Sequence, residues 1–68
     1  MKKFIEVTNK QTGRSRLIAV DYILSVIEDS DGSAFIEFYS KYGVKVYGME
    51  CKEGYAKVRC MLIDIFGG

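Results

Sequence analysis

The chain has 68 residues, the length of one small domain. Ten lysines and arginines and nine acidic residues give a formal net charge of +1, so no overall field draws the chain to nucleic acid or to an anionic membrane. The chain has no histidine, and its two cysteines, Cys51 and Cys60, do not form a metal-binding motif. We therefore expect no histidine-based catalysis, no metal site and no cofactor.

The N-terminal part of the chain predicts a β-hairpin. Residues 4–8 and 16–20 are each expected to form a strand. The segment 9–14 between them has the composition of a turn, in which Gly13 suits a positive φ. Glu6 interrupts the apolar start and no later run is long enough to cross a bilayer, so we expect neither an export signal nor a membrane span. The predicted location is the cytoplasm, with reduced thiols.

Three further strands are predicted in the middle of the chain. The run 22–27 is apolar apart from Ser25, and we expect it to form a strand that is buried on both faces. Asp31 and Gly32 are the preferred pair for a two-residue type I′ turn, which leads into a strand over 34–39. After a turn at 41–43, a fifth strand is expected over 44–47.

A C-terminal helix is predicted over about residues 50–66. Gly48 is expected to end the fifth strand, and the carboxylates of Glu50 and Glu53 favour the positive end of a helix dipole. Because every link between strands is short, the strands should pair antiparallel. The predicted fold is α+β and mainly β. It is a single domain over 1–68, built as a five-stranded antiparallel meander or small open barrel capped by the helix.

The alternation of side chains also predicts the core. The strand residues expected to point inward are Ile5, Val7, Leu17, Ala19, Leu24, Val26, Ala34, Ile36, Phe38, Val44 and Val46. One stripe of the helix should cover them, formed by Cys51, Tyr55, Val58, Leu62 and Ile65.

A second stripe lies on the opposite side of the predicted helix, formed by Ala56, Cys60 and Ile63. Small residues let another helix approach closely, and in a two-fold dimer the stripe would meet itself. The alternative is that the N-terminal strand covers this stripe within one chain. Because so short a chain buries little surface and no disulfide is expected, we interpret the stripe as an interface. Cys60 is then a small interface residue, and otherwise an exposed thiol.

Two other surfaces are candidates for binding. Phe35, Tyr39 and Tyr47 are expected to point outward, either as stacked cross-strand pairs or as a second patch for a protein partner. A basic group at the first turn could bind nucleic acid weakly and without sequence readout, or simply be solvated. Its members are Lys10, Arg14 and Arg16, with Lys41 if the strands curl appropriately.

No residue is predicted to be catalytic, because the serines lack an activating base and the acidic residues near the second hairpin are expected to be solvated. The sequence therefore predicts a non-enzymatic module that associates with itself, with a dimer as the first expectation. A further protein partner is possible. The alternative function is weak nucleic-acid binding through the basic group.

The plan of the chain resembles that of the FlbD-like proteins, small bacterial proteins associated with swarming motility and flagella. The resemblance covers residues 5–8, 17–23, 26–28 and 44–46, and the chain departs from the family pattern over 48–55. It implies a small bacterial accessory protein. The same strand order is similar to that of the LytTR-type DNA-binding domain, a resemblance that implies nucleic-acid binding. Neither family implies a catalytic residue here.

Overall fold

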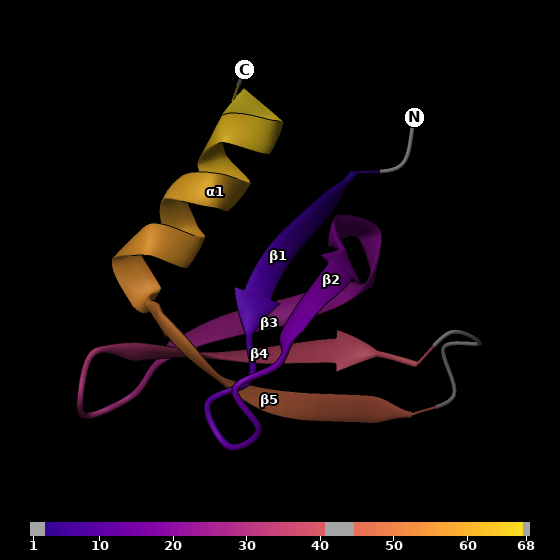
Figure 1. Ribbon diagram of the computed structural model, residues 1–68. Coiled ribbons are helices and arrows are strands. Elements are labelled where there is room, and N and C mark those ends of the chain that lie inside the picture. The colour runs from indigo at the N-terminus through magenta and orange to yellow at the C-terminus, as the bar shows by residue number, and fades with distance from the viewer. Residues whose placement is uncertain (1–2, 41–44, 68) are drawn as a thin grey trace.

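The structure, a computed structural model, describes residues 3–40 and 45–67. Five strands precede a C-terminal helix in these residues, so the predicted class, α+β and mainly β, is confirmed. Figure 1 shows their arrangement. The elements are β1 (Phe4–Thr8), β2 (Ser15–Ala19), the 3-10 helix η1 (Val20–Tyr22), β3 (Ile23–Glu28), β4 (Ser33–Tyr39), β5 (Val46–Gly54) and α1 (Tyr55–Gly67).

The strands form two antiparallel sheets instead of one continuous meander. β1 pairs with β2, and the second sheet has the order β3-β4-β5. The sheets stay open and do not close into a barrel. They meet where β1 ends, since Asn9 forms an isolated bridge with Cys51 and the Lys10 N–H donates to the Glu50 carbonyl at 2.9 Å. Because η1 turns the chain between β2 and β3, those two strands do not pair.

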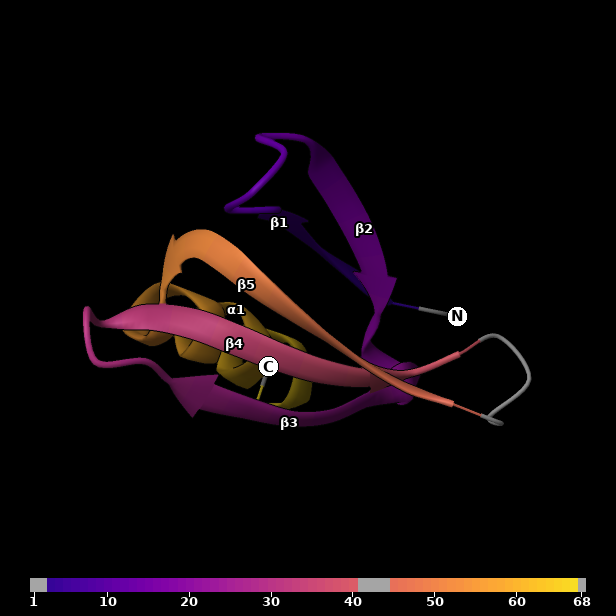
Figure 2. The same ribbon diagram turned by 90° about the horizontal axis from the view of Figure 1, so that it is seen from below.

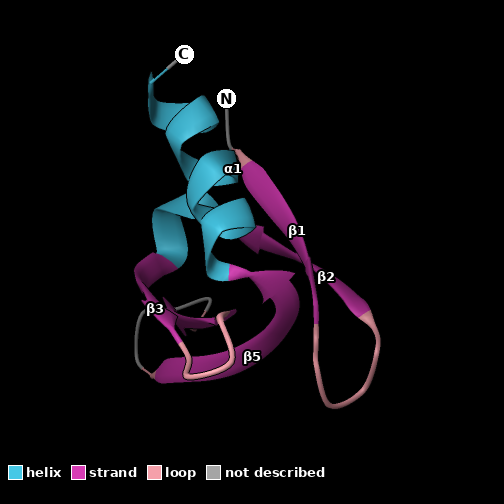
Figure 3. Ribbon diagram, turned by 90° about the vertical axis from the view of Figure 1, so that its left-hand side faces the viewer, coloured by secondary structure: helices cyan, strands magenta, loops and turns pink. Residues whose placement is uncertain are grey.

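The helix closes the core between the two sheets. In Figure 3, α1 stands above the three-stranded sheet with β1 beside it, and it contacts β1, β3, β4 and β5. Val58 is fully buried, and Met61, Leu62 and Ile65 pack against the buried cluster. The buried apolar residues are Ile5, Val7, Ile18, Val20, Ala34, Ile36, Phe38, Met49, Cys51 and Val58.

The predicted core is correct for β1 and β4 but wrong in β2. Ile18 is buried because it pairs with Ile5, whereas Leu17 is 64% exposed. Ala19 is half-buried. In a strand, a shift of one residue moves every side chain to the other face. Because residues 17–20, directly after Arg16, are all apolar, the sequence does not indicate which alternate set of them points inward.

Two further core predictions are also wrong. The β3–β4 register shifts between Ile23 and Ser25, and Leu24 at that irregularity is about half exposed. Val46 is half exposed as well, because the inward residues of β5 lie farther along the strand, at Met49 and Cys51. Val26 packs against the core as expected, and Val44 lies outside the described residues.

The helix begins five residues later than the predicted start. Gly48 does not end β5, because it pairs with Glu37 and the Phe35 ring lies over it. Glu50 pairs with Phe35, so it belongs to the strand and not to the first turn of a helix. Cys51 contributes to the core from β5 and not from the helix stripe.

The two turn glycines both have positive φ. Gly13 has φ 73°, as predicted, and Gly32 has φ 84°. The type I′ turn is wrong, however, because that turn needs positive φ at both central residues, and no described residue other than glycine has one. Instead the Gly32 N–H donates to the Asp29 carbonyl at 2.9 Å, and the left-handed glycine follows that turn.

Candidate interaction surfaces

The outer side of α1 faces solvent. Ala56, Cys60 and Ile63 are all exposed, and Ile63 has 49% of its surface accessible. β1 touches the helix but does not cover this stripe, so the alternative in which both stripes are buried within one chain is wrong. The helix therefore presents an apolar stripe that the described part of the chain leaves open.

A shallow hollow continues this exposed face onto β3. It has a volume of about 240 Å³ and is lined by Val26, Tyr55, Arg59, Leu62, Ile63 and Phe66. Phe66 is 74% exposed and was not among the predicted site residues. Its position three residues after Ile63, one helical turn along the same side, is the signal that could have identified it.

The three aromatic residues predicted as a second patch are divided between two places. Tyr47 pairs with Phe38 across β4 and β5, and their ring centroids are 6.0 Å apart. Phe35 is on the other face of β4, over Gly48. Tyr39 ends β4 and reaches the same hollow as Tyr47. The structure thus brings Tyr39 and Tyr47 together but leaves Phe35 out.

That hollow, called here the aromatic hollow, has a volume of about 480 Å³. The Arg16 guanidinium lies 4.9 Å from the centroid of the Phe38 ring at its wall. Among the described residues that line it, Arg16 is the only charged one. The lining residues are Phe4, Arg16, Leu17, Ile18, Ala19, Tyr22, Phe38, Tyr39, Ser40 and Tyr47. Sequence reasoning missed this site, since its walls come from both sheets and from η1.

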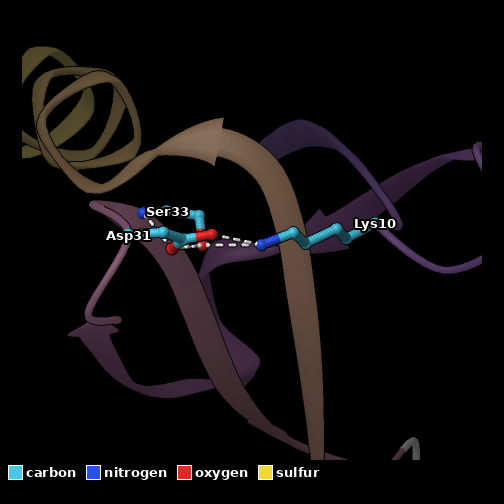
Figure 4. Close-up of polar contacts among 3 residues, drawn as sticks. All are labelled: Lys10, Asp31 and Ser33. Atoms are coloured by element: carbon cyan, nitrogen blue, oxygen red, sulfur yellow. Dashed lines mark hydrogen bonds and ion pairs between the residues drawn. The ribbon is translucent and has the colours of Figure 1, made fainter.

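The predicted basic group is dispersed by the fold. The Lys10 ammonium forms an ion pair with the Asp31 carboxylate, which joins the β1–β2 loop to the β3–β4 loop (Figure 4). Arg14 is exposed in the loop, and Arg16 lies in β2 against Phe38. Lys41 lies outside the described residues. Lys10 therefore has an acidic partner inside the chain that a nucleic acid would have to displace.

Asp31 is the centre of this contact between loops. Its carboxylate accepts hydrogen bonds from the Lys10 ammonium, from the Ser33 hydroxyl at 2.6 Å and from the Ser33 N–H at 3.0 Å. The hydrogen bond from Lys10, followed by those from Ser33, holds the pKa of Asp31 well below its usual range. The hydrogen bond to Asp31 likewise raises the pKa of Lys10. Both groups stay charged at neutral pH.

A second polar contact ties β5 to β1. The Glu53 carboxylate accepts the Thr8 N–H at 2.7 Å and the Thr8 hydroxyl at 2.9 Å. Desolvation raises the pKa of Glu53, but the hydrogen bonds from Thr8 and from its own backbone, together with the charge of Lys57, outweigh it, so this pKa is lowered. Glu53 was expected at a helix N-terminus, and its structural role was not predicted.

The two cysteines differ in exposure, since Cys51 is buried and Cys60 is exposed. Cys51 and Cys60 are both free, and burial raises the pKa of the Cys51 thiol to about 11. Within residues 3–40 and 45–67, no group of three metal-ligating side chains comes together. No helix among them is long and apolar enough to cross a membrane.

Comparisons with protein-family models, with curated proteins and with solved structures find no match to this chain. The resemblances to the FlbD-like proteins and to the LytTR-type domain therefore stay predictions.

Proposed function

We propose that this chain is a non-enzymatic interaction module that associates with itself through the outer face of α1. The observation that carries the proposal is the exposure of Ile63 and Phe66 beside the apolar hollow that extends to β3. Burying apolar surface contributes about 25 cal/mol per Å², and a chain of this size gains stability from any further burial.

The shape of the helix face suits a second copy of the same helix. Ala56 and Cys60 are small and exposed, so another helix can approach closely there, while Ile63 supplies apolar volume. A two-fold axis through this stripe would place it against itself, which makes a dimer the expected assembly.

The proposal includes a cytoplasmic setting and an accessory role in a bacterial cell. The two free cysteines support a reducing compartment, and the accessory role follows the FlbD-like resemblance. Nucleic-acid binding has less support, because Lys10 is paired with Asp31 and only Arg14 and Arg16 of the described basic group are left.

Self-association is tested by replacing Ile63. Ile63→Asp places a charge in the proposed interface, and because Ile63 is about half exposed the monomer should still fold. Light scattering behind a sizing column, with reductant and over a range of concentrations, should show about twice the 7.7 kDa chain mass for the wild type and one chain for the variant.

The matched control is Leu17→Asp, which puts the same charge at a residue that is more exposed and lies on β2. This control should keep the dimer mass. A wild-type chain that stays monomeric at every concentration contradicts the proposal. Dissociation by Leu17→Asp but not by Ile63→Asp would place the interface on β2 and not on α1.

A further inference from the structure

We propose that the free edge of β2 is a docking site for an extended segment of a partner protein. The aromatic hollow is lined by all four consecutive residues 16–19. Neighbouring residues in a strand point to opposite faces of a sheet. A hollow that touches four in a row must therefore run along the edge of the strand, and Figure 2 shows β2 with β1 on one side only.

The backbone groups at this edge are available to pair. The Val20 N–H donates to the Lys3 carbonyl at 2.9 Å. Hydrogen-bonded pairs occur at every second residue along an antiparallel ladder. The backbone N–H and C=O of Ile18, two residues before Val20, therefore also point toward β1. The N–H and C=O of Leu17 and the N–H of Ala19 consequently point away from β1, and no strand in the described part of the chain pairs with them. The Ala19 carbonyl is at the N-cap of η1, where it accepts the first hydrogen bond of that helix, so the free edge ends at the Ala19 N–H. Such an edge is a template for one more strand.

The side chains around the edge define the chemistry of the segment. Tyr22, Phe38, Tyr39 and Tyr47 give the hollow aromatic walls, and its volume of about 480 Å³ is enough for two or three side chains. Of the lining residues that the structure describes, Arg16 alone carries a charge. The complementary partner is a short extended segment with alternating apolar side chains and one acidic residue for Arg16.

A nucleic acid fits this surface less well. Within residues 3–40 and 45–67, the cations needed to neutralise several phosphates are not gathered here, since Arg16 is the single cation among the lining residues described and Lys10 is paired with Asp31. The unpaired peptide groups along the edge of β2 repeat at the spacing of an extended chain, so another peptide backbone can hydrogen-bond to them. The peptide is therefore the occupant that uses both the edge and the hollow.

Ala19→Pro tests the edge directly. Ala19 has φ −65°, which is the value that a proline ring imposes. Because its N–H does not face β1, the substitution removes an edge donor and puts a ring in its place without breaking the ladder. We expect an unchanged or higher unfolding temperature. Ala19→Ser keeps the N–H and is the matched control.

The probe is a set of heptapeptides selected from a random phage-displayed library on the immobilised full chain, then synthesised and measured by fluorescence polarisation. Selected peptides should alternate apolar residues and contain Asp or Glu. Ala19→Pro should weaken binding about tenfold or more, whereas Ala19→Ser should not. Arg16→Gln should weaken only peptides that keep the acidic residue.

A second measurement does not depend on variant folding. N-methylation of the peptide amides that face β2 should abolish binding by the wild-type chain, while N-methylation of the alternate amides should leave it intact. Equal effects at both sets of amides would overturn strand addition.

Other outcomes overturn the proposal as well. One is a library that yields no peptide above background, and another is unchanged peptide binding by Ala19→Pro. A change in the mass of the free chain on Ala19→Pro would assign the edge to a second copy. Binding of a labelled single-stranded oligonucleotide that is lost in Arg16→Gln, without peptide binding, would assign the hollow to nucleic acid.

Discussion

Cys51 and Cys60 differ in what surrounds their sulfur atoms. Cys51 has no accessible surface in the core and its pKa is raised to about 11 by burial, whereas Cys60 is exposed on α1. The thiolate is the reactive form of cysteine. Cys51 should therefore react slowly with thiol reagents, because it is inaccessible and because its thiol stays protonated.

We expect one fast-reacting thiol per native chain in the Ile63→Asp background, which keeps the helix face uncovered. Titration with a disulfide reagent at neutral pH should count one thiol, and two in denaturant. Cys60→Ser in the same background is the control and should leave no fast thiol. Rapid reaction of that control would show that Cys51 is accessible and that the core is packed differently.

Glu53 makes the stability of the fold depend on pH. Its pKa is lowered in the folded chain from an ordinary value of 4.5, so the unfolded chain binds the proton more readily. The stabilisation is therefore complete above pH 4.5 and is lost as the pH falls through the folded pKa. The partners responsible are the N–H and hydroxyl of Thr8.

Glu53→Gln should lower the free energy of unfolding by about 1 kcal/mol at pH 7, and by much less at an acidic pH below the folded pKa of Glu53, where the wild-type carboxyl is protonated too. Urea unfolding at the two pH values measures the difference. Glu6→Gln, on the exposed side of β1, is the control and should have little effect at either pH. An equal cost of Glu53→Gln at both pH values would rule out this linkage.

At the scale of the element, β5 departs most from what the sequence indicates. Residues 48–54 contain two glycines and no β-branched side chain, and local propensity there does not favour a strand. The strand forms because β4 pairs along it and because β1 meets it at Cys51. Such contacts between distant segments cannot be read from local pattern.

Gly48 is the position in β5 where packing requires glycine. A Cβ there would overlap the Phe35 ring from β4. Gly48→Val should lower the free energy of unfolding by about 1–3 kcal/mol, because the ring must move. In a Phe35→Ala background the same substitution should cost less, since the obstacle is gone.

Thermal or urea unfolding of the four variants in this cycle gives the coupling between the two sites. Gly54→Ala is a matched control in the same strand, because a Cβ there would meet only the Gly32 carbonyl at an ordinary 3.6 Å. If the effects of the two substitutions simply add, the Phe35 ring does not restrict the side chain at position 48.

For the whole molecule, the sequence predicts the order of elements and the inward side of β1, β4 and α1. Ile5, Ile36 and Val58 illustrate this, since each follows a clear period of two or of 3.6. The sequence also predicts the exposed stripe at Ile63. The division into two sheets was not predicted, because it depends on the turn at η1 and on the contact between β1 and β5. The aromatic hollow was not predicted either, because its walls come from both sheets.

The two proposed surfaces are separate on the molecule. The hollow beside α1 and the aromatic hollow have no lining residue in common among those that the structure describes. A chain that pairs through the helix can therefore keep the edge of β2 open, so self-association and partner binding need not compete. Variants at Ile63 and at Ala19 should accordingly act on different readouts.

The contact between Thr8 and Glu53 also has a consequence for biosynthesis. These residues are 45 positions apart in the chain, and Val58, at the centre of the core, comes later still. On the ribosome, the N-terminal hairpin emerges long before the segments that cover its apolar face. The domain can close only when α1 has left the exit tunnel, and until then Ile5 and Val7 are open to chaperones and to neighbouring nascent chains.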